Sequence, residues 1–600
     1  MLKKLARGVP KLGPVLRLGL RNLASAEAPE VLEATETPSR PSSAPREDLL
    51  QQWISPGATL YVNPICSQLD QMLLKCEEIE SVLALLVTHR GVFFVHNLVT
   101  AVQVLGSLAE DAKDPMAVNR LLRDPRYDVL LRDLFRFVPK LDFLAMTNVA
   151  CSLQQLDHKY YPLLSRMLKP LLEQPVPDVT TLLRCIKAYH WAGYHQQTNF
   201  YSHFAAVLAQ SAPGLSPQEL VEACSLFAGA TQYQDRFYHA AEQRVLSKDI
   251  SEFTPHQLSL IAHAFTVHLV PFHDVLLSRI AEVVEKQAMD MEPRDIVRCL
   301  SAFHRAVLYF PGAVEAGLAA CSVPLFRSWL LRKPSKLRCA EVAELLESAA
   351  FFGVETDLVQ VALDYLTDRV DEVTERASIQ VVFAMCLTGT VATHSKLLLF
   401  LFRKIGAGSA WESHRLRVFH LWASQLMQFP WLDARMKRRC IDAGLRAWCL
   451  HRRGYGCPHP EEARDISAEL QAMGVQHRTF VAVQETPYEV DIALGPGKYA
   501  LLVASETARN TLTPVGSTLL QMKHLKDRGW RCLVVPRRAW LLLESGPKGQ
   551  GPKADYLRAL LEGFLPPSAP LLARDMPKTT SATSVASGIG VKSSPASVEV

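Results

Sequence analysis

The chain has 600 residues, of which 48% are apolar and 21% are charged. This apolar fraction excludes a chain that is disordered over most of its length, and the length is more than one hydrophobic core can use. The formal charge of +5 does not by itself indicate polyanion binding, so the position of the charge matters more than its sum.

Residues 1–26 are basic and apolar, and the first carboxylate of the chain is Glu27. The basic side chains are Lys3, Lys4, Arg7, Lys11, Arg17 and Arg21. This composition is typical of a mitochondrial transit peptide, whereas a secretory signal needs an unbroken apolar run of about seven to fifteen residues. A basic tail with no targeting role is the alternative. Residues 27–50 are rich in Pro, Ser, Thr and acid and predict a disordered linker.

The segment 51–400 predicts a stack of helical hairpins. LSPQELVEACSLF from Leu215, FTPHQLSLIAHAF from Phe253 and MEPRDIVRCLSAF from Met291 align at a spacing of 38 residues. The aligned prolines suit a helix start, and Leu and Phe seven residues apart share one apolar face. Since such a unit cannot bury that face alone, the repeats predict a mostly α fold, an α-solenoid of hairpins of about 38 residues. A large irregular helical domain with chance similarity is the alternative.

The segment 401–475 predicts a basic helical connector. Between Arg403 and Arg453, eleven residues are Lys or Arg and three are Asp or Glu. Four tryptophans lie in the same window, and cations interleaved with aromatic rings suit a surface for phosphates and stacked bases. Burial of these tryptophans in a helical core is the alternative. The RNA-binding candidates of this segment are Arg435, Lys437, Arg438 and Arg439.

The segment 476–565 predicts a small α/β domain, and the residues after it, 566–600, predict a disordered tail. Short β-rich or alternating runs predict strands at 479–483, 489–494, 499–504 and 532–536. Helical patterns cover 519–527 and 554–563. No window of about eighteen residues is apolar and free of charge, so the sequence predicts no membrane span.

This C-terminal segment resembles the RAP domain of organellar RNA-binding proteins. The resemblance is carried by EVDIAL at 489–494, KYALLV at 498–503, Lys523, His524 and Leu525, GWRCLVVP at 529–536, Trp540 and YLRALLEGF at 556–564. A helical repeat array with a RAP domain at its end is similar to the FAST-kinase-domain-containing proteins and the octotricopeptide-like RAP proteins. These families imply organellar RNA metabolism, such as transcript stability, processing or translation.

The RAP domain is itself similar to restriction-endonuclease-like nucleases, which need clustered carboxylates to hold Mg²⁺. The first strand keeps Asp491, but Leu502 and Ala504 stand where the second strand would need acids. We therefore predict a noncatalytic RAP domain with no catalytic residue, no metal and no cofactor. Its RNA-binding candidates are the basic residues Lys498, Arg509, Lys523, Lys526, Arg531, Arg537 and Arg538.

Together these features predict a protein of the mitochondrial matrix that binds single-stranded RNA, a mitochondrial transcript or rRNA. In the helical array, the candidates near the first helix of a unit are Arg184, Lys187, His256, Arg294 and Arg298. A structural subunit or assembly factor of the mitochondrial ribosome, with ribosomal proteins as partners, is one alternative. A metal-dependent ribonuclease is the other.

Overall fold

The computed structural model describes residues 64–111, 115–247, 250–268, 273–321, 328, 337–354, 357–391, 393–405, 459–483, 488–495, 497–504, 506–544, 546–562 and 564. The predicted transit peptide, linker and tail lie outside the described residues, as do Arg435, Lys437, Arg438 and Arg439 of the connector. The chain divides into two compact units. The helical unit is Met1–Val418 with Ala508–Thr511, and the α/β unit is Phe419–Thr507 with Leu512–Val600.

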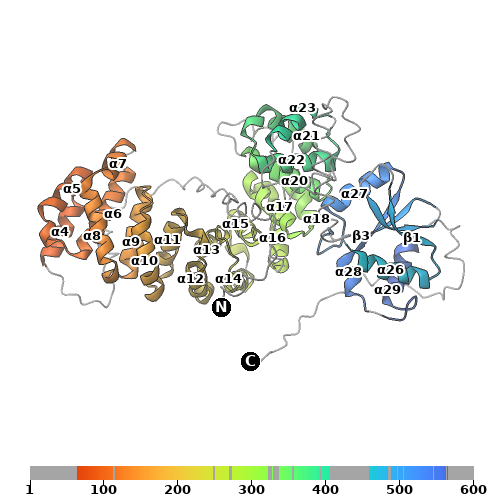
Figure 1. Cartoon of the computed structure of the whole chain (residues 1–600), viewed down its shortest axis with the longest axis horizontal. Helices are drawn as coiled ribbons and strands as arrows, with labels where there is room; N and C mark the ends of the chain where they lie inside the picture. The colour runs from red at the N-terminus through yellow and green to blue at the C-terminus, as the bar shows by residue number, and fades with distance from the viewer. Residues whose placement is uncertain are drawn as a thin grey trace, which may run out of the picture. The chain divides into compact units, whose positions relative to one another are not determined.

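The helical unit consists of helices that pack in two layers (Figure 1). In the first layer, neighbours pack in the order α4 (Pro64–Leu74), α6 (Val95–Asp111), α9 (Phe143–Gln155), α11 (Val179–Trp191), α13 (Pro217–Ala228), α15 (Pro255–Thr266), α17 (Pro293–Ala306), α20 (Cys339–Phe351) and α22 (Glu375–Thr388). The second layer contains α5 (Ile79–Thr88), α8 (Pro125–Phe137), α10 (Tyr161–Glu173), α12 (Thr198–Ser211), α14 (Asp235–Ser247), α16 (Asp274–Gln287), α18 (Pro311–Ala320), α21 (Leu358–Asp368) and α23 (Ser395–Lys404).

Short helices complete this unit. They are α7 (Pro115–Leu122) and the 3₁₀ turns η2 (Arg90–Val92), η3 (Val138–Lys140), η4 (Tyr194–Gln196), η5 (Ala212–Gly214), η6 (Ile250–Glu252), η7 (Ala288–Asp290) and η8 (Val370–Glu372). Among the described helices, none is long and apolar enough to cross a lipid bilayer.

The predicted helix starts at the aligned prolines are confirmed, since α13, α15 and α17 begin at Pro217, Pro255 and Pro293. The residue before the proline caps the helix in two of them, because the side chains of Ser216 and Thr254 accept a backbone N–H three residues on. Such capping stabilises a helix start by about 1 kcal/mol. The aligned phenylalanines are at most 1% exposed: Phe227, Phe265 and Phe303.

The α/β unit contains one four-stranded sheet in the order β1-β2-β3-β4. Its elements are α26 (Pro460–Ala472), β1 (His477–Ala482), β2 (Glu489–Leu494), β3 (Tyr499–Ala504), α27 (Gly516–Asp527), β4 (Arg531–Pro536), α28 (Arg537–Leu542) and α29 (Pro552–Glu562). The first three strands are antiparallel, and β4 returns parallel to β3 after the crossover through α27. The predicted strands and helices of this region are therefore confirmed, with ends that differ by a few residues.

Two helices cover one face of the sheet and one helix covers the other. On the first face, apolar side chains of α26 and α29 pack with those of the strands and with Trp540. On the second face, Leu525 of α27 packs against Val490, Ala500 and Leu502. Because Ile466 and Leu470 of α26 belong to the first core, the α/β unit begins well before residue 476, in the segment predicted as connector.

Candidate nucleic-acid interface

Cationic side chains gather at one end of the sheet, where the turn before β3 meets the loop between α27 and β4. The backbone N–H of Arg531 donates to the carbonyl of Lys498 at 2.8 Å. The amine of Lys498 in turn donates to the carbonyl of Arg528 at 2.9 Å. Lys526 lies in the last turn of α27, and Lys523 lies one turn before it on the same exposed side. We call these five residues the basic edge.

Aromatic rings support the basic edge. The guanidinium of Arg531 lies 5.8 Å from the ring centre of Tyr499 and 5.7 Å from that of Phe564. The two rings pack edge to face with their centres 5.6 Å apart. This packing fixes the orientation of the aromatic surface that the guanidinium contacts. Sequence reasoning missed Arg528 and the role of Phe564, although the RAP-like pattern YLRALLEGF includes Phe564.

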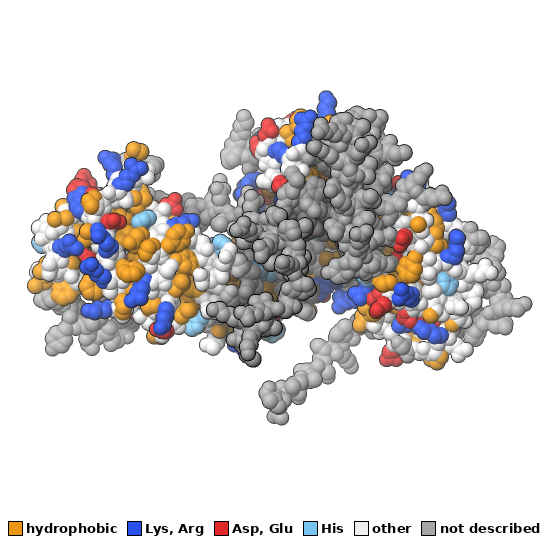
Figure 2. Space-filling model, in the orientation of Figure 1, with side chains coloured by type: hydrophobic (Ala, Val, Ile, Leu, Met, Phe, Trp, Pro, Cys, Tyr) orange, Lys and Arg blue, Asp and Glu red, His pale blue; other side chains and the backbone are white. Residues whose placement is uncertain are grey.

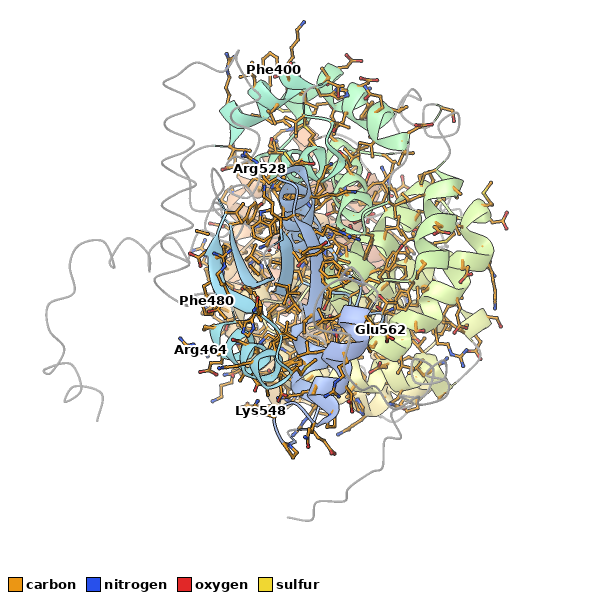
Figure 3. All side chains as sticks on the ribbon, turned by 90° about the vertical axis from the view of Figure 1, so that its right-hand side faces the viewer. Phe400, Arg464, Phe480, Arg528, Lys548 and Glu562 are labelled. Atoms are coloured by element: carbon orange, nitrogen blue, oxygen red, sulfur yellow. The ribbon has the colours of Figure 1, made fainter. Side chains whose placement is uncertain are left out.

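Three cations of the basic edge form no ion pair in the described part of the chain, although the carboxylate of Asp527 lies in the same last turn of α27 as Lys526. They are Lys498, Lys526 and Arg531, and all three are exposed. Exposed lysines and arginines of this kind bind phosphates and release counterions. Figure 3 labels Arg528 at this end of the sheet, and Arg464 and Lys548 toward the opposite end.

The structure does not bring the other predicted residues of this region to the basic edge. Arg537 and Arg538 follow the far end of β4, and the Arg537 guanidinium donates to Glu462 at 2.6 Å. Arg538 is exposed. Arg509 belongs to the helical unit, where its guanidinium lies 2.7 Å from Asp274 and its side chain is 19% exposed. Arg509 was predicted to bind RNA, but its charge is neutralised by the ion pair with Asp274.

In the helical unit, the predicted residues belong to a series of polar contacts between successive first-layer helices, which we call the polar ladder. Its contacts are Asn148–Arg184, Lys187–Glu222, Gln218–Gln257, His256–Asp295, Arg294–Glu341 and Gln380–Glu347. Arg184 and Lys187 on α11 stay exposed. Arg298 on α17 is 11% exposed and donates to Asp295 at 2.9 Å. Arg294 therefore joins α17 to α20, and Arg298 pairs with the Asp295 that joins α17 to α15, where the sequence placed RNA contacts.

The carboxylates near the β2–β3 hairpin hold backbone groups. Asp491 accepts the N–H of Val503 at 2.8 Å, and the paired residues of β2 and β3 begin only beyond it, at Ile492 and Leu501. Across from Asp491, Phe480 of β1 has a φ of 54°, a left-handed conformation that costs energy for a bulky side chain. Both residues are left out of the β1–β2 ladder.

Glu506, the acid just beyond β3, accepts hydrogen bonds from the N–H and the hydroxyl of Ser517 in the first turn of α27. A carboxylate is favourable at that helix end. Within the part of the chain that the structure describes, no three His, Cys, Asp or Glu side chains come close enough to hold a metal ion.

A histidine and a tyrosine bridge α27 to the start of β2. The hydroxyl of Tyr488 lies 2.8 Å from Nδ1 of His524, and both side chains are buried. Burial lowers the pKa of His524 to about 4, so the imidazole is neutral at pH 7 and contributes no charge to the surface of α27. The positive charge of this helix therefore comes from its exposed lysines.

No family model matches the chain, and no curated protein matches it.

Proposed function

We propose that the chain is an RNA-binding protein whose α/β unit is a noncatalytic RAP domain of restriction-endonuclease-like fold. The order of one helix, three antiparallel strands, a crossover helix and a parallel strand is compatible with that fold. The backbone contacts of Asp491 and Glu506 support a structural role for these carboxylates. The helix starts at Pro217, Pro255 and Pro293 support a repeat of about 38 residues in the helical unit.

The basic edge is the observation that carries this proposal. Three of its cations, Lys498, Lys526 and Arg531, form no ion pair within the described residues, and Arg531 lies over the rings of Tyr499 and Phe564. A row of cations beside aromatic rings matches the phosphates and bases of a single strand. On α11, the exposed Arg184 offers a further phosphate contact in the helical unit, whereas the exposed Lys187 lies 3.7 Å from Glu222.

Binding of RNA by the full chain tests the proposal. In the double variant Lys526→Ala, Arg531→Ala, we expect affinity for an oligouridine of about fifteen nucleotides to fall about tenfold at about 0.1 M salt. The slope of log K against log salt should fall by about 1.4, since each lost phosphate contact on a single strand removes about 0.7. Fluorescence anisotropy over a salt series measures both quantities.

The matched control is Arg464→Ala, Arg538→Ala, which removes two exposed cations of the same unit at the other end of the sheet. Its affinity should stay within about twofold of the parent chain, because it removes no phosphate contact. Equal losses in both double variants, or no binding by the parent, would contradict the proposal. Cleavage of the RNA in the presence of Mg²⁺ would instead favour the ribonuclease alternative.

We further propose that the protein acts in the mitochondrial matrix on transcripts or rRNA. Residues 1–26 support this location through their basic and apolar composition. Isolated mitochondria should import and shorten the full chain, and deletion of residues 1–26 should abolish import. Import that does not depend on these residues would contradict the location.

A further inference from the structure

The second-layer helices α8 and α10 expose a surface that is rich in cations and aromatic rings. It consists of Arg132, Phe135, Arg136, Lys140, Arg166 and Lys169, all of them exposed. Figure 2 shows basic and apolar side chains interspersed over the part of the helical unit where Figure 1 labels α8 and α10. We call these six residues the outer surface, and none of them was a sequence candidate.

Direct contacts join the two helices into one surface. On α8, Arg132, Phe135 and Arg136 are three or four residues apart and so share one side of the helix. The guanidinium of Arg166 on α10 lies 5.9 Å from the ring centre of Phe135 on α8. Beyond the C-terminus of α10, the side-chain amide of Gln174 donates to the carbonyl of Leu141 at 2.8 Å, next to Lys140.

The charge of the outer surface is positive. Arg136 lies 3.4 Å from Asp133, and Lys169 lies 3.7 Å from Glu173. In the described parts of the chain, Arg132, Lys140 and Arg166 form no ion pair. In the polar ladder, by contrast, most charged side chains face an opposite charge on the next helix. Arg132, Lys140 and Arg166 therefore place unpaired positive charge on the second layer.

Aromatic rings lie among these cations. Phe135 is 38% exposed, and Tyr161 at the start of α10 is 52% exposed. Lys140 lies 5.4 Å from the ring centre of Phe137. An acidic peptide would complement the cations but would leave the exposed ring of Phe135 without a stacking partner. A nucleic-acid single strand complements both, since its bases stack on rings and its phosphates bind cations.

We propose that the outer surface is a second site for single-stranded RNA, in which Phe135 stacks on a base while Arg132, Lys140 and Arg166 bind the flanking phosphates. The inference rests on the proposed RNA-binding function and places a separate contact on the second helix layer. The site recognises RNA by charge and by stacking, so it should bind any single strand that offers an unpaired base.

Crosslinking of the full chain to oligouridine, followed by peptide mapping, tests this site directly. We expect crosslinked peptides from α8 and α10 in addition to peptides from the basic edge. In binding assays, Arg132→Ala, Lys140→Ala, Arg166→Ala should lower affinity by about tenfold or more, because three phosphate contacts are lost. The matched control is Arg236→Ala, Lys286→Ala, Lys396→Ala, which removes three exposed cations elsewhere on the helical unit.

The variant Phe135→Leu separates stacking from charge. It should weaken oligouridine binding by about fivefold or more, the loss expected for one stacked base. Binding of inorganic polyphosphate, which has no bases, should not change. An equal loss with polyphosphate, or no loss with oligouridine, would overturn the proposed stacking site.

The results for the two RNA sites are independent. A parent chain that binds no oligouridine overturns the RNA-binding function itself. If the parent binds and the basic-edge variant is weakened, an outer-surface triple variant that matches its control overturns only the second site. The absence of crosslinks from α8 and α10 in the parent chain overturns it as well.

Discussion

Replacement of Asp295 by alanine is expected to lower the free energy of unfolding of the helical unit by about 3–5 kcal/mol. The carboxylate lies on α17 with its side chain 3% exposed. It accepts hydrogen bonds from Ser259 at 2.7 Å and Arg298 at 2.9 Å, and it lies 3.0 Å from the ring of His256. Alanine would leave the guanidinium of Arg298, itself 11% exposed, without a counter-charge.

The same contacts predict a pH dependence. Burial acts to raise the pKa of Asp295, but hydrogen bonds from His256 and Ser259 and the charge of Arg298 hold it below its ordinary value. A carboxylate with a lowered pKa stabilises the fold above its unfolded pKa of about 4, and this contribution is lost as the pH falls through the folded value. Asp295→Asn should therefore be less stable than the parent at pH 7, and the difference should shrink on acidification.

Hydrogen exchange of the full chain can measure this loss by region. Peptides from α15, α17 and α20 should exchange faster in Asp295→Ala, whereas peptides of the α/β unit serve as the internal reference. The control Asp290→Ala removes an exposed acid from the turn before α17 and should change stability by at most about 0.5 kcal/mol. Unchanged exchange in Asp295→Ala would show that Arg298 finds another partner.

Features of this fold that depend on local patterns could be predicted from the sequence. The prolines at 217, 255 and 293 signal helix starts because proline fits the first turn and breaks later ones. The alternating residues at the start of β2 and the continuous apolar run of β3 signal strands, because side chains point to opposite faces of the sheet and both faces are covered. Each of these signals lies within about a dozen residues, so no knowledge of packing was needed.

The partners of the charged side chains could not be predicted in the same way. Arg294 and Arg298 were placed correctly on α17, but their role depends on Glu341 and Asp295, and on how closely α15, α17 and α20 pack. The partner of Arg509, Asp274, is 235 residues away in the sequence. Sequence spacing indicates which face of a helix a charge occupies and allows the pair Arg298–Asp295 within α17, while the pairing of Arg294 depends on the neighbouring helix.

For the outer surface, by contrast, a local signal is present in the sequence, although none of its residues was predicted to bind RNA. Arg132, Phe135 and Arg136 follow a helical spacing that is visible in the sequence. RNA contacts were predicted on the first helix of each unit, whereas α8 and α10 are second-layer helices. The basic edge could be predicted only in part. Its basic residues are visible in the sequence, but the pairing of β3 with β4 is needed to place Lys498 beside Arg531.

Replacement of Trp540 by alanine is expected to destabilise the α/β unit by about 3–5 kcal/mol. The indole is fully buried and packs in the core formed by α26, α29 and the sheet. Its Nε1 donates to Asp465 on α26 at 3.0 Å, and Lys553 on α29 lies 2.7 Å from the same carboxylate and 5.1 Å from the ring centre. Alanine would therefore open a large cavity and remove a link between α26 and α28.

Trp540→Phe separates these two effects, because phenylalanine keeps most of the apolar volume but has no N–H to donate. We expect a loss of about 1–3 kcal/mol, the range for a buried hydrogen bond to a charged acceptor. Hydrogen exchange of peptides from α26 and β2 measures both variants, and Leu542→Ala is the control because Leu542 is 76% exposed. A loss in Trp540→Phe as large as in Trp540→Ala would mean that the link to Asp465, rather than the buried ring area, holds α28 on the sheet.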